Sequence, residues 1–238
     1  MTVGIRSRTL ARWLAPVVAL LVVFQLTACG DKEPEQRKAF IDYLQNTVMR
    51  SGQNLPTLSE DQRQKFGNYV NDYTIILTFS RQMKQSINNS LSPAVNSIAQ
   101  IRVPQDYLQQ KPALQQAAGT LNTLAQQIQT AKATADTAQA ALKQPDDLKA
   151  VYNQVYAQDV TQPANALIPV VPALSGFTQD IIAVGDFLGQ QGTQVAFANG
   201  AVQFPTQQQV TQYNAMMTGL LGKQQALVDA QKIIAGNL

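Results

Sequence analysis

Residues 59–89, SEDQRQKFGNYVNDYTIILTFSRQMKQSINN, decide the fold class of this chain. Their apolar residues recur at steps of three and four, which is the spacing of one face of an α-helix. Ser59 and Gln62 have the spacing of a capping box, the arrangement that satisfies backbone N–H groups at a helix start. The stretch predicts a long helix whose buried face carries Phe66, Tyr69, Val70, Tyr73, Ile76, Leu77, Met83 and Ile87.

The same periodicity predicts helices on both sides of this stretch. They begin at Pro34-Glu35, at Pro112 (running to about Lys143), at Pro145 (running to about Gln158), and at a second capping box formed by Thr206 and Gln209. In the helix from Pro112, the small residues Ala131, Ala135 and Ala138 predict close packing against a neighbour.

Proline and glycine predict interruptions between residues 163 and 192. Pro163, Pro169 and Pro172 predict a kinked or broken approach to the apolar run 174–188, because proline lacks the N–H that a helix interior needs. Gly185, Gly189 and Gly192 follow an apolar helical pattern and predict its termination.

Residues 193–204 are the exception to the helical pattern. Val195 and Phe197, then Val202 and Phe204, alternate around Asn199-Gly200, which is a strong signal for a two-residue hairpin turn. The predicted fold is therefore mainly α, a multi-helix bundle with long helices and one short β-hairpin at about 193–204.

The N-terminus has the pattern of a secretory signal peptide. Three arginines precede an unbroken apolar run at 13–24, and small residues then lead to Cys29, the only cysteine of the chain. A run of this length is shorter than the roughly 20 residues that span a bilayer, so an uncleaved membrane anchor is the less favoured alternative. We expect residues 1–28 to be a cleaved signal peptide, residues 29–34 a short tether, and residues 35–238 a single helical domain.

The segment Leu26-Thr27-Ala28-Cys29 resembles the lipobox of bacterial lipoproteins. The resemblance implies that a signal peptidase recognises Leu26, Thr27 and Ala28, cuts before Cys29, and leaves lipid attached to the Cys29 sulfur. Two or three acyl chains on one residue hold a protein stably at a membrane, whereas a single chain does not. The membrane is thus the first predicted partner.

Charge and residue inventory exclude several classes of function. The net charge of +3 comes from the three arginines of the signal peptide, and without them 15 Lys and Arg face 15 Asp and Glu. A neutral domain lacks the basic surface of a nucleic-acid binder. With no histidine and one lipidated cysteine, Ser-His-Asp and Cys-His catalysis and ordinary zinc sites are excluded, and we predict no cofactor, no metal and no catalytic residue.

The acidic pairs have a structural explanation. Glu60-Asp61 and Asp146-Asp147 lie where helices are predicted to begin, and carboxylates there are favoured by the helix dipole. Asp180 and Asp186 are six residues apart, do not share a helix face well, and are expected to be solvated.

Two surfaces leave alternatives open. Residues 160–222 contain no Lys or Arg and only two acids, so this glutamine-rich stretch is either an interaction surface or a set of uncharged solvated helix faces. Phe66, Tyr69 and Tyr73 are either core residues, the favoured interpretation, or the lining of a ligand pocket.

Several segments together resemble the YiaF-like enterobacterial lipoproteins, a family of unknown function. They are DKE (31–33), QRKAFIDYLQNTVMRSG (36–52), LPTL (55–58), ALKQPDDLK (141–149), GQQGTQVAF (189–197) and QFPT (203–206). The resemblance implies a Gram-negative envelope lipoprotein and offers no functional residue beyond Cys29. Aspartate directly after the lipidated cysteine favours the inner membrane, but Gly30 stands there and Asp31 follows, so both membranes stay open.

We therefore expect a lipid-anchored envelope protein that faces the periplasm and is not an enzyme. The leading hypothesis is a role in protein interaction or envelope integrity, with an envelope protein as partner. A periplasmic module that binds a small molecule or lipid, in a pocket between the long helices or under the hairpin, is the alternative. An enzyme that uses a carboxylate pair on glycan is a third and less favoured hypothesis.

Overall fold

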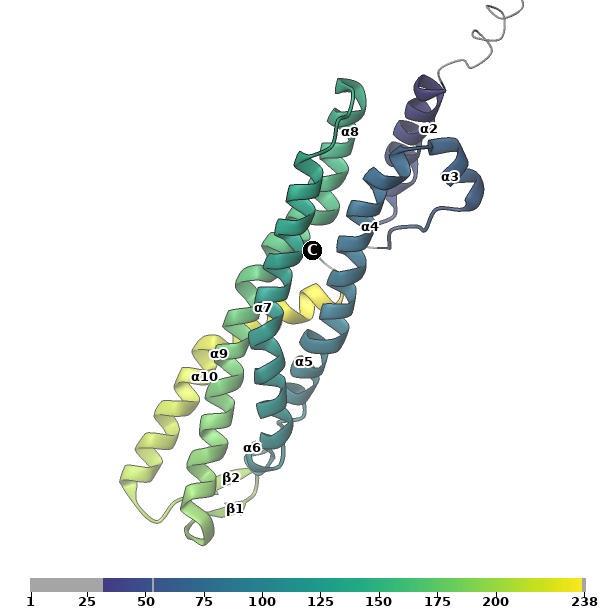
Figure 1. The fold of residues 1–238 in the computed structure, drawn as a ribbon. Coiled ribbons are helices and arrows are strands. Elements are labelled where there is room, and N and C mark those ends of the chain that lie inside the picture. Colours follow the sequence, from purple (N-terminus) through teal and green to yellow (C-terminus); the bar gives the residue numbers. More distant parts are fainter. Residues whose placement is uncertain (1–31, 53, 237–238) are drawn as a thin grey trace, which may run out of the picture.

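The structure, a computed structural model, describes residues 32–52 and 54–236, which form an elongated helical rod (Figure 1). The long helices are α4 (Tyr69–Ser86), α7 (Lys111–Ala140), α9 (Gln162–Gln191) and α10 (Gln207–Ile234). The shorter helices are α2 (Glu33–Asn46), α3 (Glu60–Phe66), α5 (Ser92–Ala99), α6 (Asp106–Gln109) and α8 (Asp146–Tyr156). Single turns are η1 (Val48–Arg50), η2 (Ile87–Leu91), η3 (Ala157–Thr161) and η4 (Gly192–Gln194), and the strands are β1 (Ala196–Ala198) and β2 (Ala201–Gln203). The prediction of a mainly α multi-helix bundle with one short hairpin is confirmed.

The stretch 59–89 forms two helices rather than one. The capping box of Ser59 and Gln62 starts α3 as predicted, but α3 ends at Gly67, which has a φ of 55°. Left-handed backbone is natural for glycine and ends a helix, so α4 begins anew at Tyr69. The predicted face is buried at Phe66, Tyr73, Ile76, Leu77 and Met83.

The aromatic residues of this stretch belong to the core. The rings of Phe66 and Tyr43 have centroids 5.0 Å apart, and Tyr73 meets Tyr43 edge-on at 5.6 Å. Tyr69 stacks on Phe40 at 5.7 Å. These separations are those of packed aromatic pairs, which confirms the favoured interpretation of Phe66, Tyr69 and Tyr73 as core residues.

Two π turns carry the long helices past prolines. In η2 the N–H of Ser92 donates to the carbonyl of Ile87, and in η3 the N–H of Gln162 donates to the carbonyl of Ala157. A proline stands two positions after the end of each turn: Pro93 after η2 and Pro163 after η3. A proline has no N–H and its ring crowds the carbonyl four residues earlier, so one wider turn before it relieves the clash. The helices α4–η2–α5 and α8–η3–α9 are continuous as a result.

Of the predicted kink or break at Pro163, Pro169 and Pro172, the break is wrong. Pro163 lies in the first turn of α9, directly after the π turn that accommodates it, and Pro169 and Pro172 lie inside this helix without ending it. Gly185 and Gly189 also lie within α9, and only Gly192, with a φ of 55°, ends it as predicted. Packing on both sides of α9 outweighs the local cost of its prolines.

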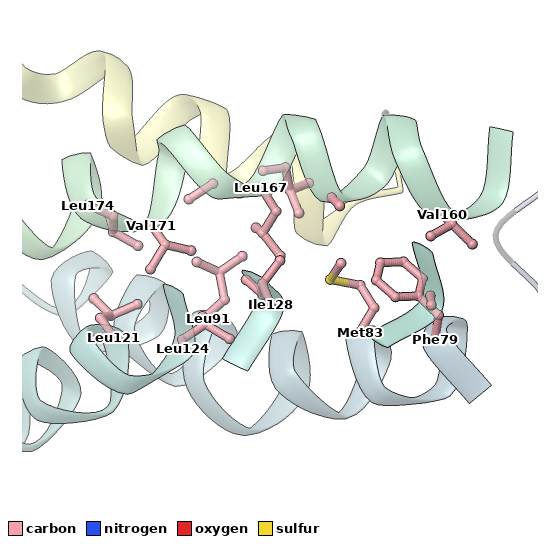
Figure 2. Close-up of a cluster of buried hydrophobic side chains, with 14 of the residues drawn as sticks. Phe79, Met83, Leu91, Leu121, Leu124, Ile128, Val160, Leu167, Val171 and Leu174 are labelled. Carbon is pink, nitrogen blue, oxygen red and sulfur yellow. The ribbon is translucent and has the colours of Figure 1, made fainter. Parts of the chain in front are cut away.

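The centre of the bundle is α9, which lies between α7 and α10. Figure 2 shows Val160, Leu167, Val171 and Leu174 pointing from the α8–α9 rod toward Leu121, Leu124 and Ile128 of α7 and toward Leu91. Their burial removes apolar side chains from water, which drives association of these helices. Residues 146–194 are also long and apolar enough to span a bilayer by length and composition, and 44% of their most apolar window is buried inside the bundle.

The hairpin lies at one end of the rod, opposite α2 and α8 (Figure 1). Phe197 pairs with Val202, and Asn199 and Gly200 have φ values of 52° and 76°, as the predicted turn requires. Phe204 then packs between Phe187 of α9 and Tyr213 of α10, with ring centroids 5.8 and 5.3 Å away. These contacts supply the support that an isolated hairpin lacks.

Substitution of Gly185 tests the close approach between α9 and α6. A Cβ at Gly185 would lie 2.6 Å from the Tyr107 carbonyl oxygen, so we expect Gly185→Ala to lower the free energy of unfolding by about 1–3 kcal/mol. Gly176→Ala, in the same helix with nothing within 4 Å, should instead raise it by about 0.5–1 kcal/mol. Urea unfolding followed by circular dichroism measures both, and equal effects of the two substitutions would contradict this packing.

Candidate binding sites

The predicted processing site lies outside the described residues. Leu26, Thr27, Ala28 and Cys29 all precede residue 32, so the structure does not test cleavage or lipid attachment. Helix α2 begins at Glu33, four residues after Cys29. The described part of the chain offers two other places with the features of a binding site.

The first is a cavity of about 400 Å³ between α4–η2 and the η3–α9 junction. Phe79 and Met83 contribute buried apolar surface from α4, Ile87 comes from η2, and Pro163 comes from α9. Figure 2 shows Phe79 and Met83 pointing from α4 toward the rod that carries Val160. Both π turns therefore border one cavity, whose size is in the range of small-molecule sites.

Asp159 of η3 lines this cavity and is only 9% exposed. Its Oδ2 is buried and has no hydrogen-bond partner among the residues that the structure describes. Burial without a compensating charge raises the pKa of this carboxyl from 3.8 to about 7. Near neutral pH the group is thus divided between its ionised and protonated forms.

The second buried acid of the bundle shows the contrast. Asp72 of α4 is 8% exposed, and burial raises its pKa as well. Its Oδ2 accepts a hydrogen bond of 2.6 Å from Gln144, and its backbone carbonyl accepts one of 2.8 Å from Tyr152. Asp72 is therefore a satisfied structural residue, as buried polar groups usually are. Asp159 Oδ2 has no partner in the described chain, as is also true of the Tyr43 hydroxyl and Gln105 Oε1.

A loop over the cavity is held by polar contacts. The Tyr73 hydroxyl donates to the Pro56 carbonyl at 2.7 Å, and Lys84 donates to Asn54 at 2.7 Å. On the opposite side the Gln158 amide donates to the Met49 carbonyl at 3.3 Å. Lys84, part of the cavity wall, is directed to the loop by this contact.

The second place is an apolar groove of about 380 Å³ beside α10. Its wall includes Ile98 of α5, Phe177 of α9, and Met217, Leu221 and Val228 of α10. Leu221 is 62% exposed and Val228 is 40% exposed. Helix α10 has 28 residues but buries only Leu220, Ala230 and Ile233, so much of its apolar surface faces solvent.

The charges near this groove are paired with each other. Asp180 of α9 accepts from Lys223 of α10 at 2.5 Å, and Asp186 of α9 forms an ion pair with Lys111 of α7. These are the only two acids of the stretch 160–222. The stretch 160–222 thus carries little free charge.

A third hollow, of about 730 Å³, has amide and hydroxyl side chains in its walls, including Gln82, Gln85 and Asn89 on one side and Thr123 and Gln126 of α7 on the other. Within residues 32–52 and 54–236, no group of three or more His, Cys, Asp or Glu side chains is placed to hold a metal ion.

The predicted capping acids lie where the sequence put them. Glu60 and Asp61 are in the first turn of α3, and Asp146 and Asp147 are in the first turn of α8. Asp147 lies 3.5 Å from Arg37 of α2, which joins α2 and α8 at one end of the rod.

Comparison with known proteins gives the family of this chain. Residues 17–235 match the family described as "Protein of unknown function (DUF3053)". The chain belongs to this family. It is 51% identical over 224 residues to the "Uncharacterized protein YiaF" of Escherichia coli strain K12, an alignment that covers 94% of this chain and 95% of the relative. The protein of that name in Shigella flexneri matches equally. No solved structure matches the chain.

The comparison confirms the resemblance to YiaF-like enterobacterial proteins of unknown function, and the DUF3053 match includes Cys29. It assigns no role to Asp159, which the sequence analysis had also missed. The sequence feature that could have pointed to Asp159 is Pro163, four residues later. Because proline has no N–H, the backbone carbonyl of Asp159 lacks its usual helical donor. That signal marks an irregular turn, but the cavity beside it depends on α4.

Asp159 predicts a distinctive dependence of stability on pH. The unfolded carboxyl ionises near pH 4 and the folded one near pH 7, so the folded state binds more protons in between and its stability falls as pH rises from 4 to 7. Asp159→Asn should remove this slope. The free energy of unfolding of the variant, relative to that of the native protein, should therefore increase by an amount on the order of a few kcal/mol from pH 4 to pH 8. Urea midpoints measured across this range give the comparison.

Asp106→Asn is the matched control. Backbone N–H groups of Arg102 and Val103 donate to this carboxylate and lower its pKa, so it stays ionised from pH 5 to 8. The difference between this variant and the native protein should be constant over that range. A constant difference for Asp159→Asn as well would show that Asp159 does not titrate near neutrality.

Proposed function

We propose that this protein is a lipid-anchored envelope protein that faces the periplasm and acts by binding another envelope protein rather than by catalysis. The signal-peptide pattern and the Leu26-Thr27-Ala28-Cys29 segment support the anchor. The observation that carries the binding role is the exposed apolar face of α10 beside the groove at Leu221 and Val228. Nucleic acid is not proposed as a partner, since the mature chain is neutral.

The anchor would set the orientation of the rod. Glu33 is four residues after Cys29, a reach of at most about 14 Å, so the end formed by α2 and α8 would stay close to the membrane. The rod α8–η3–α9 extends from there for about 69 Å at ~1.5 Å per residue. The hairpin and the start of α10 would then be presented well away from the bilayer (Figure 1).

The partner is inferred from the chemistry of the face. Leu221 and Val228 offer apolar area, while the nearby Asp180 and Lys223 already neutralise each other. A surface of this kind favours burial against an uncharged apolar surface and gives little long-range electrostatic attraction. We therefore propose a neutral apolar face of an envelope protein as the partner surface.

Cys29→Ser tests the anchor. Without the thiol no thioether to lipid forms, so we expect loss of fatty-acid labelling and accumulation of the unprocessed precursor in cells. Labelling with an alkyne palmitate and the size of the mature band measure these effects. An unchanged mature band and unchanged labelling would refute lipid attachment at Cys29.

Leu221 tests the interaction face. A photocrosslinking residue at position 221 should give a discrete adduct in intact cells, and an adjacent Val228→Asp substitution should reduce its yield about tenfold by placing a charge in an apolar contact. Gln212 is also exposed and lies nine residues earlier, on the opposite side of α10, so a crosslinker there is the control. Equal adducts at 212 and 221, or no effect of Val228→Asp, would exclude this face.

A second role, binding of a small molecule, is favoured by one separate observation. The cavity has the volume of a ligand site, and it is lined by Asp159, whose buried Oδ2 has no partner in the described chain. This role does not depend on the face of α10, since the cavity is lined mainly by α4, η2, η3 and α9 and shares no lining residue with the groove.

A further inference from the structure

We infer that the cavity beside Asp159 binds an organic cation, a protonated amine with a short apolar body, whose ammonium group donates to the Asp159 carboxylate. The inference rests on the proposed small-molecule role and names its ligand class. It requires a negative group without a partner, an apolar wall of fitting size, and no competing cation at the carboxylate.

The negative group is Asp159. A buried carboxylate oxygen without a hydrogen bond is costly, so a donor brought by a ligand to the Asp159 carboxylate would offset a cost that the described residues leave uncompensated. Asp159 is held by the π turn η3 rather than by a flexible loop, and Gln158 ties this turn to Met49. A rigid carboxylate whose oxygen has no donor is complementary to an N–H group that brings a positive charge.

The apolar body is set by the walls. Phe79 and Met83 are buried, and Leu55, Ile87 and Ala166 add partly covered apolar surface around them. A cavity of about 400 Å³ holds an alkyl chain of several carbons together with its ammonium group. An inorganic cation would leave this apolar surface unused, and an anion would meet Asp159 with the wrong charge.

The groups that face Asp159 leave the carboxylate free for a ligand. Tyr73 of α4 is in electrostatic contact with it, and burial raises the pKa of this phenol, so it stays neutral. Tyr43 of α2 packs on Tyr73 and its pKa is also raised by burial. The nearest cations on α4 are directed elsewhere, with Lys84 donating to Asn54 and Arg81 exposed to solvent.

Proton and ligand compete for the same carboxylate. A bound ammonium favours the ionised form, so the ligand binds more tightly as Asp159 loses its proton. For a carboxyl with a pKa of about 7, the affinity should fall about 30-fold from pH 8 to pH 5.5. A neutral ligand would not follow this profile.

The test is calorimetric titration of the full chain in detergent micelles with hexylammonium, which stays charged from pH 5.5 to 8. Hexanol and hexanoate have the same chain length with neutral and negative heads. We expect hexylammonium to bind at least about tenfold more tightly than either at pH 8, and to show the pH profile above. Titration of Asp159→Asn in the same micelles corrects for partitioning and should show an affinity at least about tenfold lower.

Two further variants test how the cavity volume and the nearby lysine contribute to binding, independently of the Asp159 carboxylate. Ala166→Phe narrows the cavity without touching Asp159 and should weaken binding, whereas Lys84→Gln removes a cation from the wall and should preserve or strengthen it. Circular dichroism shows whether each variant is folded. The pH dependence of hexylammonium binding to the native protein is a test that requires no substitution.

The outcomes distinguish this inference from the role on which it rests. Hexanol or hexanoate binding as tightly as hexylammonium, with loss in Ala166→Phe, would keep a small-molecule site and overturn the cation. Hexylammonium binding that Asp159→Asn leaves intact would also overturn it. If none of the three compounds binds the native protein, both the cation and the small-molecule role fail.

Discussion

The architecture depends on one constraint, the passage of long helices through prolines. A proline removes a backbone donor and crowds the carbonyl four residues earlier, which normally ends or kinks a helix. Here a π turn before Pro93 and another before Pro163 absorb the conflict, so two rods continue where separate helices would otherwise meet at angles. The length of the bundle and the position of Asp159 both follow from these two turns.

The two turns also explain why the cavity lies where it does. A π turn widens the helix by one residue and changes the direction of the side chains that follow. Ile87 and Asp159 stand in the two turns and face the same space between α4 and α9. The core between α7 and α9 is well filled, with Leu121, Leu124 and Leu174 fully covered, whereas a cavity lies where the two irregular turns face each other.

Charge is distributed unevenly along the rod. The end with α2 and α8 carries interacting charges such as Arg37 and Asp147, whereas the stretch 160–222 has two acids, each paired with a lysine from another helix. The proposed anchor would put the charged end near the membrane and the apolar face of α10 farther out. The buried Asp159, between these regions, is the one described acid with a pKa raised to about 7.

The sequence by itself determined the helical class, the two capping boxes, the hairpin at Asn199-Gly200 and the family, because each depends on spacing or on residues close in the chain. The sequence pattern misplaced the ends of helices in two places. Gly67 divides a stretch whose apolar period runs on, and the helix with Pro169 and Pro172 stays whole, because its packing against α7 and α10 outweighs the lost hydrogen bonds.

Only the tertiary structure decided the binding places. The exposure of Leu221 depends on which side of α10 meets α9, and a periodic pattern does not specify the neighbour. Asp159 is one acid among 15 Asp and Glu in the sequence. The cavity that Asp159 lines forms because α4, some 80 residues away in the chain, packs beside η3. Packing between segments so far apart is not encoded in a local sequence pattern.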